Sequence, residues 1–175
     1  WTISGGPVEG VFLCYGVLPE QQDASTDSEL ARRTIDVNFT SAVLLLDRIA
    51  ERLRRQGRGW IAVGASVAGD RGRRSNYLYG ATKAGLATYL QGLRSALLSA
   101  GVHVLTIKPG YVGTRMINGR KVAASWMIAT PERVARDIDR AIRRKRNVLY
   151  TPWYWRCILA FARALPERVF KRLSY

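Results

Sequence analysis

The chain has 175 residues, of which 47% are hydrophobic and 23% charged. This length and composition suit one domain with a buried core and exclude a disordered chain. The formal net charge of +15 is most simply explained by solvated helix faces, and a nucleic acid, an anionic membrane surface or phosphorylated ligands are the alternatives. No recognised nucleic-acid motif accompanies the basic residues, so we expect no nucleic-acid partner.

Cysteine and histidine are too scarce to build a metal site. Cys14 and Cys157 cannot form a disulfide framework, and His103 has no acidic or cysteine residue near it in the sequence. We therefore expect no bound metal and a reducing compartment, the cytoplasm. The chain begins with Trp1, and no signal-peptide pattern follows it, so we expect a processed or partial product.

The first half of the chain predicts two strands around one long helix. Val8–Tyr15 is a short, mostly apolar run that ends at Gly16, as in a buried parallel strand. A helix is expected over Asp27–Arg55, with Ser25 or Asp27 as its cap and the glycines of Gln56–Gly59 as its end. Trp60–Ala65 then predicts the second strand.

The second half repeats this alternation. A long helix is expected over Tyr77–Ala100, followed by a strand over Val102–Ile107. Thr130 and Pro131 predict the start of another helix, and Val148–Tyr150 predicts a fourth strand. Strands alternating with long helices indicate an α/β fold with a parallel sheet, whose ligands bind beyond the carboxyl ends of the strands.

Four polar residues on these elements suggest hydride transfer to or from a carbonyl. Tyr79 and Lys83 are four residues apart, so they share one helix face. The ammonium would bring the tyrosine from its usual pKa of ~10 towards that of a working proton donor. Ser66, after a strand, could bind the substrate carbonyl, and Asn38 could hold a water that connects Lys83 to solvent.

Each of these residues, taken alone, has a simpler interpretation. Tyr79 is then a packed aromatic, Ser66 a turn or capping residue, and Asn38 a polar helix residue. Pro109-Gly110 alone is merely a turn. Their joint occurrence, in this order and on these elements, favours the catalytic interpretation.

The motifs around these residues resemble those of the short-chain dehydrogenase/reductase family from about Val8 to Tyr150. Gly64–Gly69 and Tyr79–Ala84 are similar to the family's catalytic serine and tyrosine-lysine motifs, and Asp36–Asn38 to its asparagine motif. The resemblance implies Asn38, Ser66, Tyr79 and Lys83 as catalytic residues and NAD or NADP as cofactor.

The same resemblance implies cofactor contacts. Pro109–Thr114 is similar to the segment that contacts nicotinamide, which suggests contacts from Pro109, Gly110, Val112 and Thr114, besides Tyr79 and Lys83. Gly16 stands where the family usually ends the motif Asn-Asn-Ala-Gly, and it would allow a close backbone approach to the cofactor.

One family feature is missing from the sequence. No Gly-x-x-x-Gly-x-Gly loop precedes these motifs, so the nucleotide-binding half is not included. The expected fold is the C-terminal part of a Rossmann-type doubly wound sheet without its first strands. We expect this chain alone to be an inactive fragment, in which the Val8–Tyr15 strand is an exposed edge that favours homo-oligomers.

A narrower resemblance concerns the substrate. The segments Asp70–Tyr77 and Trp153–Trp155 are similar to a bacterial branch that includes the reductase partner of the polyprenylphosphoryl-ribose epimerase. This implies a lipid-linked keto-sugar as substrate. Arg71, Arg73 and Arg74 lie between Ser66 and Tyr79 and are candidate phosphate ligands, although such charge runs are usually only solvated.

The C-terminal tail has a different composition. We expect residues 1–150 to form the partial dinucleotide-binding domain and residues 151–175 an amphipathic tail. Its tryptophans and arginines suit a helix at the inner face of a membrane, and packing on the domain or on a second copy is the alternative. A non-enzymatic membrane-surface or interaction protein remains the second functional hypothesis.

Overall fold

The structure, a computed structural model, describes residues 6–117, 119, 122 and 124–172. Its centre is a parallel sheet of four strands in the order β1-β2-β3-β6. The strands are β1 (Gly10–Leu13), β2 (Gly59–Gly64), β3 (Val102–Pro109) and β6 (Val148–Thr151). The predicted α/β class with a parallel sheet is confirmed.

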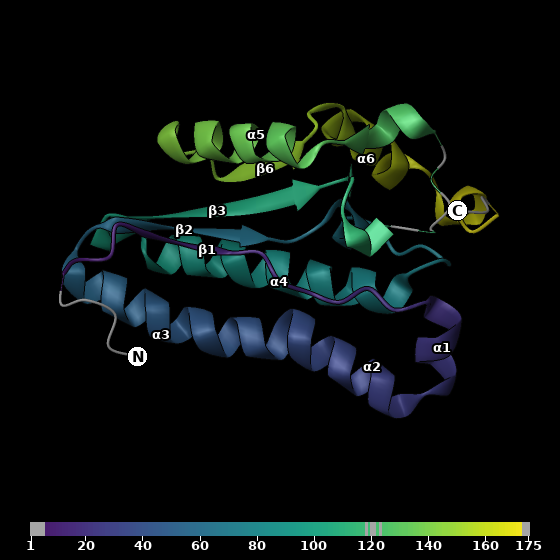
Figure 1. The fold of residues 1–175 in the computed structure, drawn as a ribbon, viewed down its shortest axis with the longest axis horizontal. Coiled ribbons are helices and arrows are strands. Elements are labelled where there is room, and N and C mark those ends of the chain that lie inside the picture. Colours follow the sequence, from purple (N-terminus) through teal and green to yellow (C-terminus); the bar gives the residue numbers. More distant parts are fainter. Residues whose placement is uncertain (1–5, 118, 120–121, 123, 173–175) are drawn as a thin grey trace.

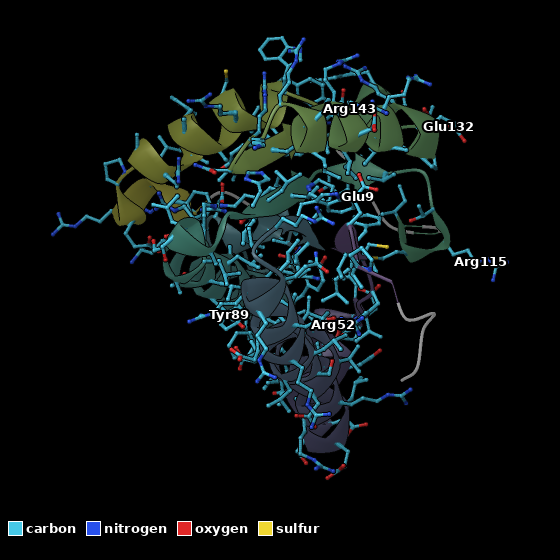
Figure 2. All side chains as sticks on the ribbon, turned by 90° about the vertical axis from the view of Figure 1, so that its left-hand side faces the viewer. Glu9, Arg52, Tyr89, Arg115, Glu132 and Arg143 are labelled. Atoms are coloured by element: carbon cyan, nitrogen blue, oxygen red, sulfur yellow. The ribbon has the colours of Figure 1, made fainter. Side chains whose placement is uncertain are left out.

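Two helical layers cover the sheet (Figure 1). One layer holds α1 (Gln21–Thr26), α2 (Ser28–Ile35), α3 (Ser41–Gln56) and α4 (Tyr77–Ala96). On the opposite side lie α5 (Pro131–Arg143) and α6 (Tyr154–Ala164). Figure 2 shows Glu132 and Arg143 on the α5 layer and Arg52 on the α3 layer.

Several short elements connect these layers. The strands β4 (Tyr111–Val112) and β5 (Ile128–Ala129) form a small parallel pair of their own. The helix α7 (Glu167–Phe170) follows α6 after Pro166. Short 3₁₀ segments are η2 (Val67–Gly69), η3 (Leu98–Ala100), η4 (Arg115–Ile117) and η5 (Ser125–Met127).

The predicted helix Asp27–Arg55 is interrupted once. The carboxylate of Asp27 accepts the backbone N–H groups of Glu29 and Leu30, as expected of a cap, and α3 ends at Gly57 with φ of 74°. Between α2 and α3 the chain forms a π-helical turn, η1, over Asp36–Thr40. A 3.6-residue periodicity does not predict such a turn, which often marks a functional site.

The principal core lies between the sheet and the α3–α4 layer. Leu46 of α3, Leu90 of α4 and Leu97 at the C-cap of α4 are fully buried against Ile61 and Val104 of the strands. A smaller core joins the other face of the sheet to α5. Within the described residues, no helix combines the length and apolarity needed to cross a bilayer.

Candidate active site

Tyr79 and Lys83 lie on the first turns of α4, facing the carboxyl end of β2. Both are buried, and the Lys83 Nζ lies 5.9 Å from the centre of the Tyr79 ring. The ammonium donates a hydrogen bond of 2.9 Å to the backbone carbonyl of Gly64, which is a neutral acceptor. Burial lowers the pKa of Lys83 from 10.5 to about 8, and the interaction with Cys14, the smaller cause, acts in the opposite direction.

Ser66 follows β2 directly and caps the 3₁₀ segment η2. Its Oγ accepts the backbone N–H of Ala68 at 3.1 Å, so the hydroxyl proton is left for donation to another acceptor. The segment lies tightly on α4 because each side of the contact carries a glycine, Gly69 in η2 and Gly80 in α4. A Cβ on Gly69 would come within 2.7 Å of the Ala84 nitrogen, and one on Gly80 within 2.8 Å of the Ala68 oxygen.

Asn38 occupies the middle of the π-helical turn and is 1% exposed. Its amide bonds both backbone groups of Val17: Oδ1 accepts the N–H at 2.8 Å, and Nδ2 donates to the carbonyl at 2.8 Å. Asn38 therefore fixes the loop that follows β1. Its predicted role in holding a water remains a prediction.

Gly16 lies where Asn38 and Lys83 come together. A Cβ on Gly16 would be 2.9 Å from the Asn38 Oδ1 and 3.3 Å from the Lys83 Nζ. Only glycine leaves this corner open, so the backbone is accessible at a point bordered by an amide and an ammonium. The predicted close approach of a cofactor to Gly16 is compatible with this geometry.

The predicted nicotinamide segment leaves the carboxyl end of β3. Pro109 is the last residue of that strand, and Gly110 packs so closely on Trp155 that a Cβ would overlap the indole. Val112 lies in β4, beside an apolar cavity of about 620 Å³ between β1 and α5. Thr114 is exposed, and its N–H bonds the Val112 carbonyl at 2.7 Å.

The three arginines predicted to contact substrate phosphate have different surroundings. Arg71 reaches the end of α6, where its guanidinium donates to the carbonyls of Ala162, Arg163 and Leu165 and pairs with Glu167 at 2.9 Å. Both terminal nitrogens of its guanidinium are therefore already engaged within the protein. Arg73 and Arg74 instead line a separate cavity, and the substrate role of all three remains a prediction.

A second buried polar cluster was not predicted. The Asp70 carboxylate, 2% exposed, accepts a bond of 2.5 Å from the Lys108 ammonium and one of 2.6 Å from the Tyr150 hydroxyl. One sequence signal could have found it: Lys108 is the only charged side chain in the last six residues of a buried strand, and a buried ammonium needs a counter-charge.

The arrangement can support proton transfer next to a carbonyl group. Gly16, Asn38, Ser66, Tyr79 and Lys83 gather at the carboxyl ends of β1 and β2, and Pro109–Val112 leaves the neighbouring strand β3. Among the described residues, no three histidine, cysteine or acidic side chains are grouped as metal ligands would be. The catalytic and cofactor roles of the individual residues remain predictions.

Comparisons with known proteins identify the family of the chain. A family model described as short chain dehydrogenase matches residues 4–124. An uncharacterized oxidoreductase of Mycobacterium tuberculosis is 39% identical over 168 residues, which cover 96% of this chain and 67% of the relative. Another from Streptomyces coelicolor is 33% identical over 172 residues, with 98% and 67% coverage.

Solved structures show the same fold. A short-chain dehydrogenase from Sphingobium yanoikuyae, in complex with NADPH, superposes with a TM-score of 0.75 at 23% identity, covering 89% of this chain and 66% of that one. One from Burkholderia cenocepacia, in complex with NADP, gives a TM-score of 0.78 at 20% identity, with 93% and 68% coverage. The chain spans about two thirds of the length of these proteins. The match of the family model, the relatives and the fold together establish that the chain belongs to the short-chain dehydrogenase family.

Proposed function

We propose that this chain carries the catalytic residues of an NAD- or NADP-dependent oxidoreductase that interconverts a carbonyl compound and an alcohol. The observation that supports this best is the pair Tyr79–Lys83, buried at the carboxyl end of β2 beside the Ser66 segment. The relatives are named as oxidoreductases, so the comparisons do not favour the non-enzymatic alternative.

The residues present fit the nicotinamide and ribose end of the cofactor. The open corner at Gly16, where a Cβ would meet Asn38 and Lys83, is a place where a ligand can touch the backbone. Lys83 would hold ribose hydroxyls, and Pro109, Gly110, Val112 and Thr114 would contact the nicotinamide. When bound, the cofactor supplies or accepts the hydride.

The protein's own groups would handle the proton. In the reduction, the Tyr79 hydroxyl gives its proton to the substrate oxygen while the Ser66 hydroxyl donates a hydrogen bond to the same oxygen. The Lys83 ammonium stabilises the phenolate left on Tyr79, because an adjacent positive charge favours the ionised form. The reverse reaction uses the same groups in the opposite order.

The test compares two tyrosines, each near a buried lysine, in the full-length protein. Tyr79→Phe should lower the rate of carbonyl reduction by ~10²–10⁴, the range for a lost general acid. Tyr150→Phe is the matched control, because Tyr150 also lies near a lysine but bonds Asp70 instead of facing the site. Equal turnover in Tyr79→Phe and wild type would remove Tyr79 from this role.

For the substrate, we propose a carbonyl compound carried on a lipid phosphate, such as a keto-sugar. The support is the resemblance of residues 70–77 and 153–155 to the epimerase-reductase branch, together with the arginines beside the site. Steady-state kinetics with a polyprenylphosphoryl keto-pentose and the free keto-pentose should give a much lower KM for the lipid-linked compound. Equal KM values would contradict this choice of substrate.

We also propose peripheral contact with an anionic membrane through α6. Trp155 and Leu159 bury one face of this helix, whereas Trp153 and Phe161, each 69% exposed, lie eight residues apart on the other. A helix that is apolar on two faces needs a second apolar neighbour. The basic residues of the same C-terminal segment suit acidic lipid headgroups: they are Arg156, Arg163, Arg168, Lys171 and Arg172.

Vesicle co-sedimentation tests this contact. The double variant Trp153→Ser/Phe161→Ser should bind anionic vesicles several-fold more weakly than wild type, and salt should weaken wild-type binding through screening. Leu44→Ser removes an exposed leucine from the opposite layer and is the control, with no change expected. Unchanged vesicle binding in the double variant would rule out α6 as the contact.

A further inference from the structure

A basic cavity lies between the loop that precedes α4 and the short helix α7. Its volume is about 400 Å³. Both walls carry cations, Arg73 and Arg74 from the loop and Lys171 from the end of α7. Glu167 is the acidic residue that lines it, and this carboxylate is paired with Arg71 at 2.9 Å. The cavity therefore has an excess of positive charge.

Arg71 holds the two walls of the cavity together. Its guanidinium crosses from the loop to the end of α6, bonds three backbone carbonyls there, and lies 4.0 Å from the centre of the Phe170 ring. These contacts fix α7 against residues 72–77. The run Arg71-Gly72-Arg73-Arg74 thus has two functions: Arg71 joins the walls, while Arg73 and Arg74 face the space between them.

Two further observations point to an anion. The Arg73 Nε is buried without a hydrogen-bond partner among the described residues, so one donor in this wall is unsatisfied. Tyr77, which also lines the cavity, is the first residue of the 20-residue helix α4. The N-terminus of such a helix carries a partial positive charge and favours negative groups.

We propose that this cavity binds the phosphate group of the substrate, held by Arg73, Arg74 and Lys171. Guanidinium and ammonium groups bind phosphate oxygens by charge-assisted hydrogen bonds, and arginine can do so with two parallel bonds. Tyr77 and Tyr79 are two residues apart, about 3 Å along the axis of α4, but they lie on opposite sides of this helix, so a substrate with its phosphate in the cavity must extend around the first turn of α4 to reach the proton donor. The assignment to the substrate rests on the proposed oxidoreductase function, whereas phosphate binding does not.

Calorimetric titration with inorganic phosphate tests the cavity without any turnover. Arg73→Gln and Lys171→Gln should each weaken binding about tenfold, the loss expected for one charge-assisted bond. Glu167→Gln should strengthen it, an effect that an unfolded variant cannot produce. Arg52→Gln makes the same change of charge on α3, remote from the cavity, and should leave the affinity unchanged (Figure 2). Equal affinity in wild type, Arg73→Gln and Lys171→Gln would overturn the proposal.

Two further arms identify the source of the phosphate in the full-length protein. If it belongs to the substrate, Arg73→Gln should raise the KM for a phosphate-bearing carbonyl compound about tenfold and leave that for a neutral one unchanged. If it belongs to a lipid headgroup, the same variant should lose binding to phosphatidic acid vesicles, with both KM values unchanged, and the substrate assignment would be wrong. A protein without turnover that still binds phosphate would refute only the proposed function.

Discussion

Lys83 and Lys108 form two similar pairs with tyrosines, but the two ammonium groups are bonded to different acceptors. This difference suits a proposed catalytic role for Lys83 and a structural role for Lys108. Lys83 is 3% exposed and Lys108 is 9% exposed, and their ammonium groups lie 5.9 and 5.4 Å from the ring centres of Tyr79 and Tyr150. Lys108 is bonded to the Asp70 carboxylate. Lys83 is bonded to a neutral carbonyl, and burial lowers its pKa to about 8.

A carboxylate is thus what distinguishes the second pair. Asp70 bonds both Lys108 and Tyr150, so it connects the loop after β2 with the ends of β3 and β6. A closed ionic network of this kind holds segments in place. Among the described residues, no carboxylate is bonded to the Lys83 ammonium, which suits its proposed role of stabilising the charge of Tyr79.

The largest effect on stability is expected from Asp70→Asn. This change removes the negative charge and leaves the Lys108 ammonium buried, which should lower the free energy of unfolding by about 3–5 kcal/mol. Chemical denaturation measures the loss. The control is Asp139→Asn, because the pair of Asp139 with Arg143 is exposed on α5 and should be worth less than ~1 kcal/mol. Equal losses in the free energy of unfolding of the two variants would show that the Asp70 network contributes no more to stability than an exposed ion pair.

Lys83→Met should raise the free energy of unfolding, whereas Asp70→Asn should lower it. A buried ammonium without a carboxylate is unfavourable, so its removal should raise the free energy of unfolding at pH 7 by about 1–3 kcal/mol, after allowing for the lost bond to Gly64. The same variant should lose most of the proposed activity. A protein that is more stable and less active is typical of a functional residue in an unfavourable environment.

The pH dependence provides the control for this prediction. The folded-state pKa of Lys83 is about 8 and the unfolded value is 10.5, so the unfolded chain binds more protons between these two values. Wild-type stability should therefore rise with pH across this window relative to Lys83→Met. Parallel curves of unfolding free energy against pH for the two proteins from pH 7.5 to 10.5 would mean that the pKa of Lys83 is not lowered in the folded state.

The Lys83 pair could be predicted from the sequence because it is local. Tyr79 and Lys83 are one helical turn apart, so helix geometry alone places them on one face. The caps at Asp27 and Thr130 and the end of α3 at Gly57 are local in the same sense, and the structure confirms them. Family motifs then supplied the candidate roles of Ser66 and Asn38.

The Asp70 network could not be predicted in this way. Asp70 is 38 residues from Lys108 and 80 from Tyr150, and three packed elements are needed to bring them together. The contacts of Arg71 with α6 span more than 90 residues, so its role looked the same as those of Arg73 and Arg74. The lysine in strand β3 required a counter-charge, but nothing local identified which carboxylate provides it.

The smallest effect on stability is expected from Tyr150→Phe, which removes one bond to Asp70 and keeps the bond from Lys108. The free energy of unfolding should fall by about 1–2 kcal/mol, the usual value for a hydrogen bond to a charged group. Burial, and then the bond to Asp70, raise the pKa of Tyr150 from 10.0 to about 12. The contribution of this tyrosine is therefore complete below pH 10 and is lost as the pH rises through 12, opposite in sign to that of Lys83. Denaturation curves of Tyr150→Phe and wild type should converge over this range, and a constant difference would show that the hydroxyl does not titrate with the Asp70 network.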